Sequence, residues 1–199
     1  HGSATKLTKI KDNSVDYVYT DPPYGANIAY LDLSLMWNAW LNLDNKFKKS
    51  EEAIEGGSEH LSKENYLKIM GESFKEIYRV LKPQKYLSLV FQHKDPKLWY
   101  DIIEQCEQQG FKYVNAFSYG SHYKSYHKTS NPLNVVSGYM IINFKKSVGK
   151  SKIHQSKLDI KNIVDEIIGD LQKNDNSTIE NIVTLLVPKM LEKKINPKN

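Results

Sequence analysis

Short apolar stretches with strand and helix periodicity alternate along the first 146 residues of this 199-residue chain. The spacing predicts four strands, at residues 15–20, 86–91, 111–119 and 135–144, and three helices, at residues 31–43, 62–81 and 95–109. This order favours an α/β fold with a mainly parallel sheet. Four strands are few for a doubly wound domain, so either the sheet is small or part of it lies outside this chain.

The chain changes character after Lys146. Two stretches beyond it have helical spacing of apolar residues: 158–171 and 179–191. From Lys145 onward there are 11 lysines and 7 acidic residues, so most of the net charge of +5 lies in this part. We therefore predict an α/β region at 1–146 and a lysine-rich helical appendage at 147–199. These lysines can form the solvated face of a packed helical hairpin, contact a DNA backbone or meet a partner helix.

Composition excludes several classes of protein. Cys106 is the only cysteine, which excludes an internal disulfide framework and a multi-cysteine zinc site. No apolar run approaches the ~18 residues of a membrane span, and no signal-peptide pattern opens the chain. These observations predict a cytoplasmic protein without membrane association. The excess of 28 basic over 23 acidic residues favours an anionic partner.

The stretch Asp21-Pro22-Pro23-Tyr24 directly follows the first predicted strand, where open α/β sheets bind their ligands. The two prolines restrict the backbone and hold the Asp21 carboxylate and nearby carbonyls as a rigid set of hydrogen-bond acceptors. An amino group with two donors fits such a set, and the Tyr24 ring offers a flat face for a base. The alternative is a plain Asx-type turn with an incidental tyrosine.

Residues 13–25 resemble the catalytic motif of S-adenosyl-L-methionine-dependent amino-group DNA methyltransferases. Further stretches resemble adenine-specific DNA methylases: 30–34, 78–83, 89–95 and 110–111. The resemblance covers roughly residues 3–146 and implies a Rossmann-like methyltransferase fold, S-adenosyl-L-methionine as cofactor and DNA as partner. It implies that Asp21 and the Pro22 carbonyl bind the target amino group, that Asp21 also lies at the cofactor, that Tyr24 stacks on the extruded base and that Pro23 holds the turn. The Asp-Pro-Pro-Tyr form favours adenine.

Two further segments are predicted to contact nucleic acid. His93 and Lys94 follow a strand end, although Asp95 beside them can simply cap the next helix. The loop between the last two strands interleaves aromatic and cationic residues suited to a base and its phosphates: Tyr123, Lys124, Tyr126 and Lys128. A solvated hairpin loop is the alternative there. We predict no metal site.

A Gly-rich turn between a strand and a helix, which usually holds such a cofactor, is missing from this sequence. The sequence therefore predicts the target-binding half of a methyltransferase, with its cofactor-binding half elsewhere in the parent chain. Alone, the chain is expected to be inactive, with an incomplete cofactor pocket. Two alternatives stay open: a non-catalytic DNA-binding or assembly module derived from a methylase, and a methyltransferase acting on cytosine, RNA or protein. The oligomeric state is not predicted.

Overall fold

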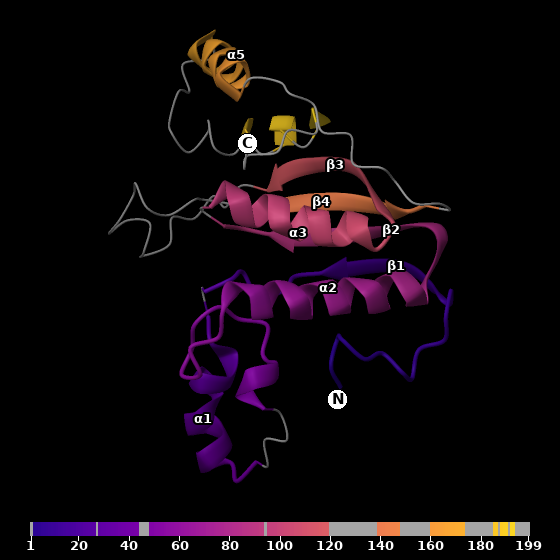
Figure 1. Ribbon diagram of the computed structural model, residues 1–199, viewed down its shortest axis with the longest axis vertical. Coiled ribbons are helices and arrows are strands. Elements are labelled where there is room, and N and C mark those ends of the chain that lie inside the picture. The colour runs from indigo at the N-terminus through magenta and orange to yellow at the C-terminus, as the bar shows by residue number, and fades with distance from the viewer. Residues whose placement is uncertain are drawn as a thin grey trace.

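A four-stranded mixed sheet, covered on one face by two helices, forms the body of the computed structural model (Figure 1). The structure describes the following residues: 2–26, 28–43, 48–93, 95–119, 139–147, 160–173, 185–186, 188–190 and 192–193. The strands are β1 (Val15–Thr20), β2 (Leu81–Phe91), β3 (Phe111–Tyr119) and β4 (Tyr139–Lys146). The helices are α1 (Tyr30–Trp40), the short 3-10 helix η1 (Lys49–Glu51), α2 (Lys63–Val80), α3 (Pro96–Gln108) and α5 (Ile160–Lys173).

The sheet confirms the predicted α/β fold class. Its strand order is β1-β2-β4-β3, with β1 parallel to β2 and β4 antiparallel to both of its neighbours. β1, β2 and β3 therefore run in one direction and β4 in the other. Helices connect the strands that share a direction, as crossover connections require. The carboxyl ends of β1 and β2 consequently meet at the same edge of the sheet.

The core lies between the sheet and helices α2 and α3, which cover the same face (Figure 1). On α2, buried residues recur at helical spacing: Tyr66, Met70, Phe74 and Ile77. They pack against alternate residues of the central strands: Leu87, Leu89, Phe91, Ile142 and Phe144. Both helices begin at N-caps, because the Ser62 and Asp95 side chains accept hydrogen bonds from the Asn65 and Lys97 amides.

The opposite face of the sheet carries a polar chain with one residue from each strand. The Tyr17 hydroxyl donates to Ser88 Oγ at 2.7 Å, and the Ser88 hydroxyl donates to the Asn143 side-chain oxygen. Asn143 Nδ2 in turn donates to Asn115 Oδ1 at 2.8 Å. Large aromatic side chains on the strands, among them Tyr19 and Tyr86, are exposed.

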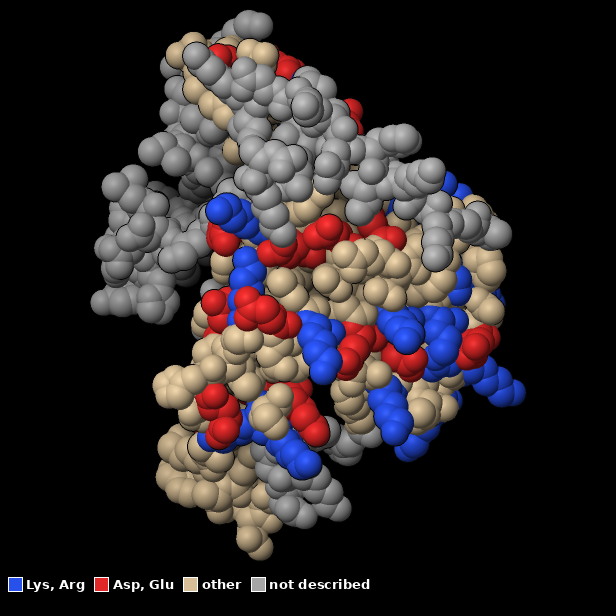
Figure 2. Space-filling view, viewed as in Figure 1, with Lys and Arg blue, Asp and Glu red and all other residues tan. Residues whose placement is uncertain are grey.

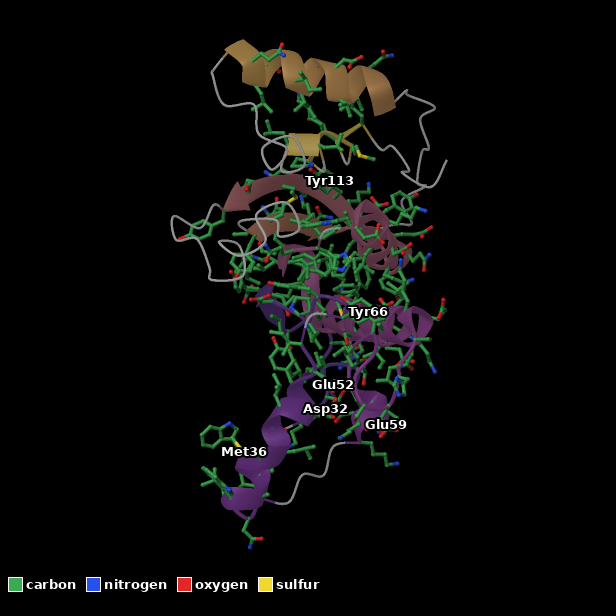
Figure 3. All side chains as sticks on the ribbon, turned by 90° about the vertical axis from the view of Figure 1, so that its left-hand side faces the viewer. Asp32, Met36, Glu52, Glu59, Tyr66 and Tyr113 are labelled. Atoms are coloured by element: carbon green, nitrogen blue, oxygen red, sulfur yellow. The ribbon has the colours of Figure 1, made fainter. Side chains whose placement is uncertain are left out.

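Helix α1 lies away from the sheet and buries none of its residues (Figure 1). Polar contacts attach it to the segment before α2, where Asp32 accepts hydrogen bonds from the Ser58 amide at 2.9 Å and the Ser58 hydroxyl at 2.7 Å. Lys49 lies 2.7 Å from the same carboxylate, and these partners lower the pKa of Asp32 to about 2. The Leu31 amide donates to Glu52, which lies close to Asp32 in Figure 3.

The C-terminal part contains a second, small apolar cluster. Ile163, Ile167 and Leu171 of α5 pack with Met190, with Leu186 at the edge of the cluster. Helix α5 falls within the predicted helical appendage, and it lies beyond β3 in Figure 1. Among the helices described, none is long and apolar enough to cross a membrane.

Candidate active site

The segment from Asp21 to Gly25 follows β1 directly and belongs to no helix or strand. Asp21 is exposed, Pro22, Pro23 and Tyr24 are half-buried, and Gly25 is buried. We call these five residues the Asp21 turn. Because Thr20 pairs with Leu89 near the end of the parallel strand β2, the turn lies beside the residues that follow β2.

Within the turn, the Tyr24 hydroxyl donates a hydrogen bond to Asp21 Oδ1. The Tyr24 ring meets Phe91 edge-on, with ring centroids 5.3 Å apart, and is tilted against Tyr139 at 6.3 Å. Burial and the neighbouring carboxylate raise the pKa of Tyr24 well above its usual range, so the phenol stays protonated and remains a donor. Asp21 therefore has a donor next to it in the free chain.

Helix α2 contacts the Asp21 turn through the side chain of Tyr66. The buried Tyr66 hydroxyl donates to the Pro23 carbonyl at 2.8 Å. The Glu55 amide donates to the Gly25 carbonyl at 3.2 Å. Figure 3 shows Tyr66 on the sheet side of the Asp32 and Glu52 contacts.

His93 packs behind the same turn. Its Nδ1 accepts a hydrogen bond from the Asp95 amide at 3.0 Å, and its carbonyl accepts one from Trp99 Nε1 at 2.7 Å. A Cβ atom on Gly25 would lie 3.5 Å from His93 Nε2 and 3.0 Å from Leu98 Cδ2, so only glycine fits without displacement. Gly25 also has a φ of +60°, in the left-handed region. Burial lowers the pKa of His93, which favours a neutral imidazole.

The predicted site residues thus fall into two groups. The structure brings Asp21, Pro22, Pro23 and Tyr24 together with His93 at one edge of the sheet. The other predicted nucleic-acid contacts lie outside the described residues: Lys94, Tyr123, Lys124, Tyr126 and Lys128. Asp95 caps α3, as the alternative interpretation of that segment held.

Sequence reasoning missed the residues that reach the turn from elsewhere. Tyr66 lies in the helix predicted at 62–81, but the sequence does not mark it, Glu55 or Tyr139 as site residues. A tyrosine among aliphatic core residues signals that its hydroxyl needs a buried partner. The sequence does not say which partner, because Tyr66 and Pro23 are 43 positions apart.

The described residues offer no group of three or more His, Cys, Asp and Glu side chains suited to a metal ion. On the face seen in Figure 2, lysines and acidic residues are interspersed over α2 and α3. Lys63, for example, lies 3.0 Å from Asp101. Lysine charge on this face is therefore partly neutralised within the protein.

The structure thus places an Asp-Pro-Pro-Tyr turn directly after the first strand of an α/β sheet. The sequence resemblance predicts this arrangement for a DNA methylase. A family model described as DNA methylase matches residues 15–181, which is most of the chain. The chain therefore belongs to the DNA methylase family.

Similar solved structures include TTHA0409 of Thermus thermophilus, assigned as a DNA modification methylase. In its complex with S-adenosyl-L-methionine it is 20% identical to this chain, with a TM-score of 0.44, and the match covers 76% of this chain and 56% of that one. The PvuII DNA methyltransferase, which is cytosine-N4-specific, is 13% identical, with a TM-score of 0.47, and the match covers 89% and 62%. Across three TTHA0409 structures, the chain spans 53% to 62% of the matched protein. No curated protein matches the chain.

Proposed function

We propose that this chain supplies the target-base site of an S-adenosyl-L-methionine-dependent methyltransferase that methylates the exocyclic amino group of adenine in DNA. The observation that carries the proposal is the exposed Asp21 carboxylate on a turn stiffened by Pro22 and Pro23, directly after β1. Membership of the DNA methylase family supports DNA as the substrate. The Asp-Pro-Pro-Tyr form favours adenine over cytosine.

The residues of the turn act by orienting the amino group. The exocyclic nitrogen of adenine is a poor nucleophile because its lone pair is delocalised into the ring. Asp21 and the Pro22 carbonyl would accept its two N–H hydrogens and direct the lone pair out of the ring plane, towards the methyl donor. A carboxylate has about four lone-pair positions, so Asp21 can accept this hydrogen bond as well as the one from Tyr24.

The base must leave the duplex to reach Asp21, and this extrusion costs a few kcal/mol. Tyr24 would contact the extruded base, with Tyr139 beside it.

Covalent catalysis by cysteine is not required. Cys106 is fully buried in α3, and burial raises the pKa of its thiol, so it is not available as a nucleophile.

S-adenosyl-L-methionine would supply the methyl group from a positively charged sulfur. The exposed Asp21 carboxylate fits that charge. The adenosine part requires further contacts, and the Gly-rich turn that usually makes them is not found in this sequence. Among the described strands, β1 pairs on one side only, so its free edge can accept another strand. We infer that another segment of the parent protein adds to this edge and holds the cofactor.

The alternative, a non-catalytic DNA-binding module whose contact surface is the lysine-rich tail, is less well supported. Lys189 and Lys193 lie 2.9 Å and 3.0 Å from the Glu166 carboxylate. These lysines are therefore already paired within the tail, which reduces the charge they can offer to phosphates.

The test is methyl transfer from tritiated S-adenosyl-L-methionine to unmethylated plasmid DNA by the full parent protein, followed by digestion and identification of the methylated base. We expect N6-methyladenine, and its loss in the Asp21→Ala variant. Detection of N4-methylcytosine alone would contradict the adenine assignment. DNA binding without any methyl transfer would favour the non-catalytic module.

A further inference from the structure

The side-chain hydroxyl of Tyr66 contacts the backbone of the Asp21 turn. This hydroxyl donates to the Pro23 carbonyl at 2.8 Å. Tyr66 itself is 0% exposed, in the first half of α2. The phenol donates its hydrogen, so the hydroxyl holds the peptide group between Pro23 and Tyr24.

This hydrogen bond matters because few others among the described contacts hold the backbone of the turn. Pro22 and Pro23 have no amide hydrogen, and the turn belongs to no helix or strand. A buried carbonyl without a partner is costly, so the Tyr66 hydroxyl sets the direction of the Pro23 carbonyl. Among the described contacts, the Glu55 amide satisfies the next carbonyl but one, that of Gly25, at 3.2 Å.

The core holds the Tyr66 ring rigidly. Tyr66 belongs to the core cluster with Met70 and Phe74, so its ring position follows from the packing of α2 on the sheet. Gly25 lies close to Leu98 and His93, with no room for a larger side chain between them. The Tyr66 hydroxyl therefore links the direction of the Pro23 carbonyl to the packing of the core.

We propose that Tyr66 is a positioning residue for methyl transfer, a role that rests on the function proposed above. By holding the Pro23 carbonyl, its hydroxyl fixes the turn backbone that carries the Asp21 carboxylate and the Pro22 carbonyl. These two acceptors then meet the target amino group in one fixed geometry. Tyr66 touches neither the base nor the cofactor.

The experiment compares two variants that each remove one hydroxyl from α2. Tyr66→Phe removes the contact with the turn. Tyr78→Phe is the matched control, because the Tyr78 hydroxyl also donates to a backbone carbonyl at 2.8 Å, that of Ser147, away from the turn. The full parent protein is assayed with tritiated S-adenosyl-L-methionine and unmethylated plasmid DNA. In parallel, hydrogen exchange is measured at the amides of Tyr24 and Gly25.

We expect Tyr66→Phe to lower kcat about 10- to 100-fold, with KM for DNA and cofactor changed by less than about threefold, because misplaced acceptors affect the transfer step more than binding. Exchange at the amides of Tyr24 and Gly25, which follow the released Pro23 carbonyl, should be at least about tenfold faster than in the wild type. Tyr78→Phe should leave both measurements unchanged.

Three results would overturn the proposal. If the wild type transfers methyl groups and neither Tyr66→Phe nor Tyr78→Phe lowers kcat, Tyr66 does not position the acceptors. If kcat falls equally in both variants, the effect is one of general stability. If the wild type itself transfers no methyl group to DNA, the proposed function fails, and the positioning role fails with it.

Discussion

The Tyr24 hydroxyl donates a hydrogen bond to the Asp21 carboxylate three residues before it. The ring that would contact the base and the carboxylate that would bind the amino group are thus linked in the free chain. The phenol stays protonated over the whole neutral range because burial and Asp21 both raise the pKa of Tyr24. An arriving amino group must share Asp21 with this hydroxyl or displace it.

The Tyr24→Phe variant should separate these two roles of the tyrosine. It keeps the ring contact with Phe91 and removes the donor to Asp21, so methylation should persist, with KM for DNA equal to or below that of the wild type. Tyr24→Ala should instead weaken binding of the extruded base by about 1–3 kcal/mol. Steady-state kinetics of the parent protein on plasmid DNA measure both. Equal losses in the two variants would contradict this separation.

Asp21→Asn should lower kcat by about 100- to 1000-fold, because a neutral amide is a weaker acceptor for a donor whose charge develops during transfer. The exposed Asp21 side chain contributes little to packing, so thermal unfolding should not change. Asp16→Asn is the control, since Asp16 is an exposed acid on β1 whose partner Lys82 lies away from the turn. Activity within about tenfold of wild type in Asp21→Asn would contradict the assignment.

Stability should fall as pH drops through the histidine range. Burial lowers the folded-state pKa of His93 below 6.5, so the unfolded chain binds more protons there. The free energy of unfolding therefore decreases from pH 6.5 downwards, until the folded-state pKa is passed. Asp95, Glu55 and Lys63 also act on this imidazole, the two acids opposing the shift and the lysine adding to it.

The measurement is urea unfolding between about pH 7.5 and pH 5.5, for the wild type and His93→Gln. The difference between the two pH profiles isolates His93 from the other titrating groups. A wild-type profile parallel to that of His93→Gln would mean that the imidazole titrates equally in both states.

Lys146→Met should destabilise the protein by about 2–3 kcal/mol. The buried Lys146 ammonium donates to the Leu81 carbonyl at 2.7 Å, to Asn13 Oδ1 at 2.8 Å and to the Tyr78 carbonyl, and methionine leaves these acceptors without a donor. Lys145→Met is the matched control. Lys145 is next to Lys146 in sequence but lies over the Tyr86 ring on the other face of the sheet, where it contributes less than about 1 kcal/mol. Chemical unfolding of both variants checks this, and equal losses would contradict it.

Calorimetry of the 199-residue chain with S-adenosyl-L-methionine should give no micromolar binding, because the contact at Asp21 alone covers a small part of the ligand. DNA binding should be weak and should fall steeply as salt increases. Micromolar cofactor affinity would show that this chain holds the adenosine contacts after all.

Much of the fold follows from sequence periodicity. β1 has the predicted bounds, and α2 differs from its prediction by one residue at each end. β2 begins at Leu81 rather than at residue 86, although Pro83 lies inside it. The register with β1 shifts here, from Val15 opposite Leu81 to Tyr17 opposite Tyr86. The missing amide of Pro83 therefore falls where no pairing with β1 is required.

The site was predictable only where its parts are neighbours in sequence. Asp21 and Tyr24 stand in one short motif, and the strand before them identifies their edge of the sheet. Tyr66 and Glu55 approach the same turn through tertiary packing, which periodicity cannot reveal. The antiparallel direction of β4 was equally hidden, because apolar alternation is the same for both strand directions.

The polar chain across the sheet has a consequence for the site. Tyr17, Ser88, Asn143 and Asn115 join all four strands side by side, so sliding any one strand by a residue would break a contact and turn a polar group towards the core. Hydrogen bonds on the exposed face and packing in the core therefore both align the strand ends that precede Asp21 and His93.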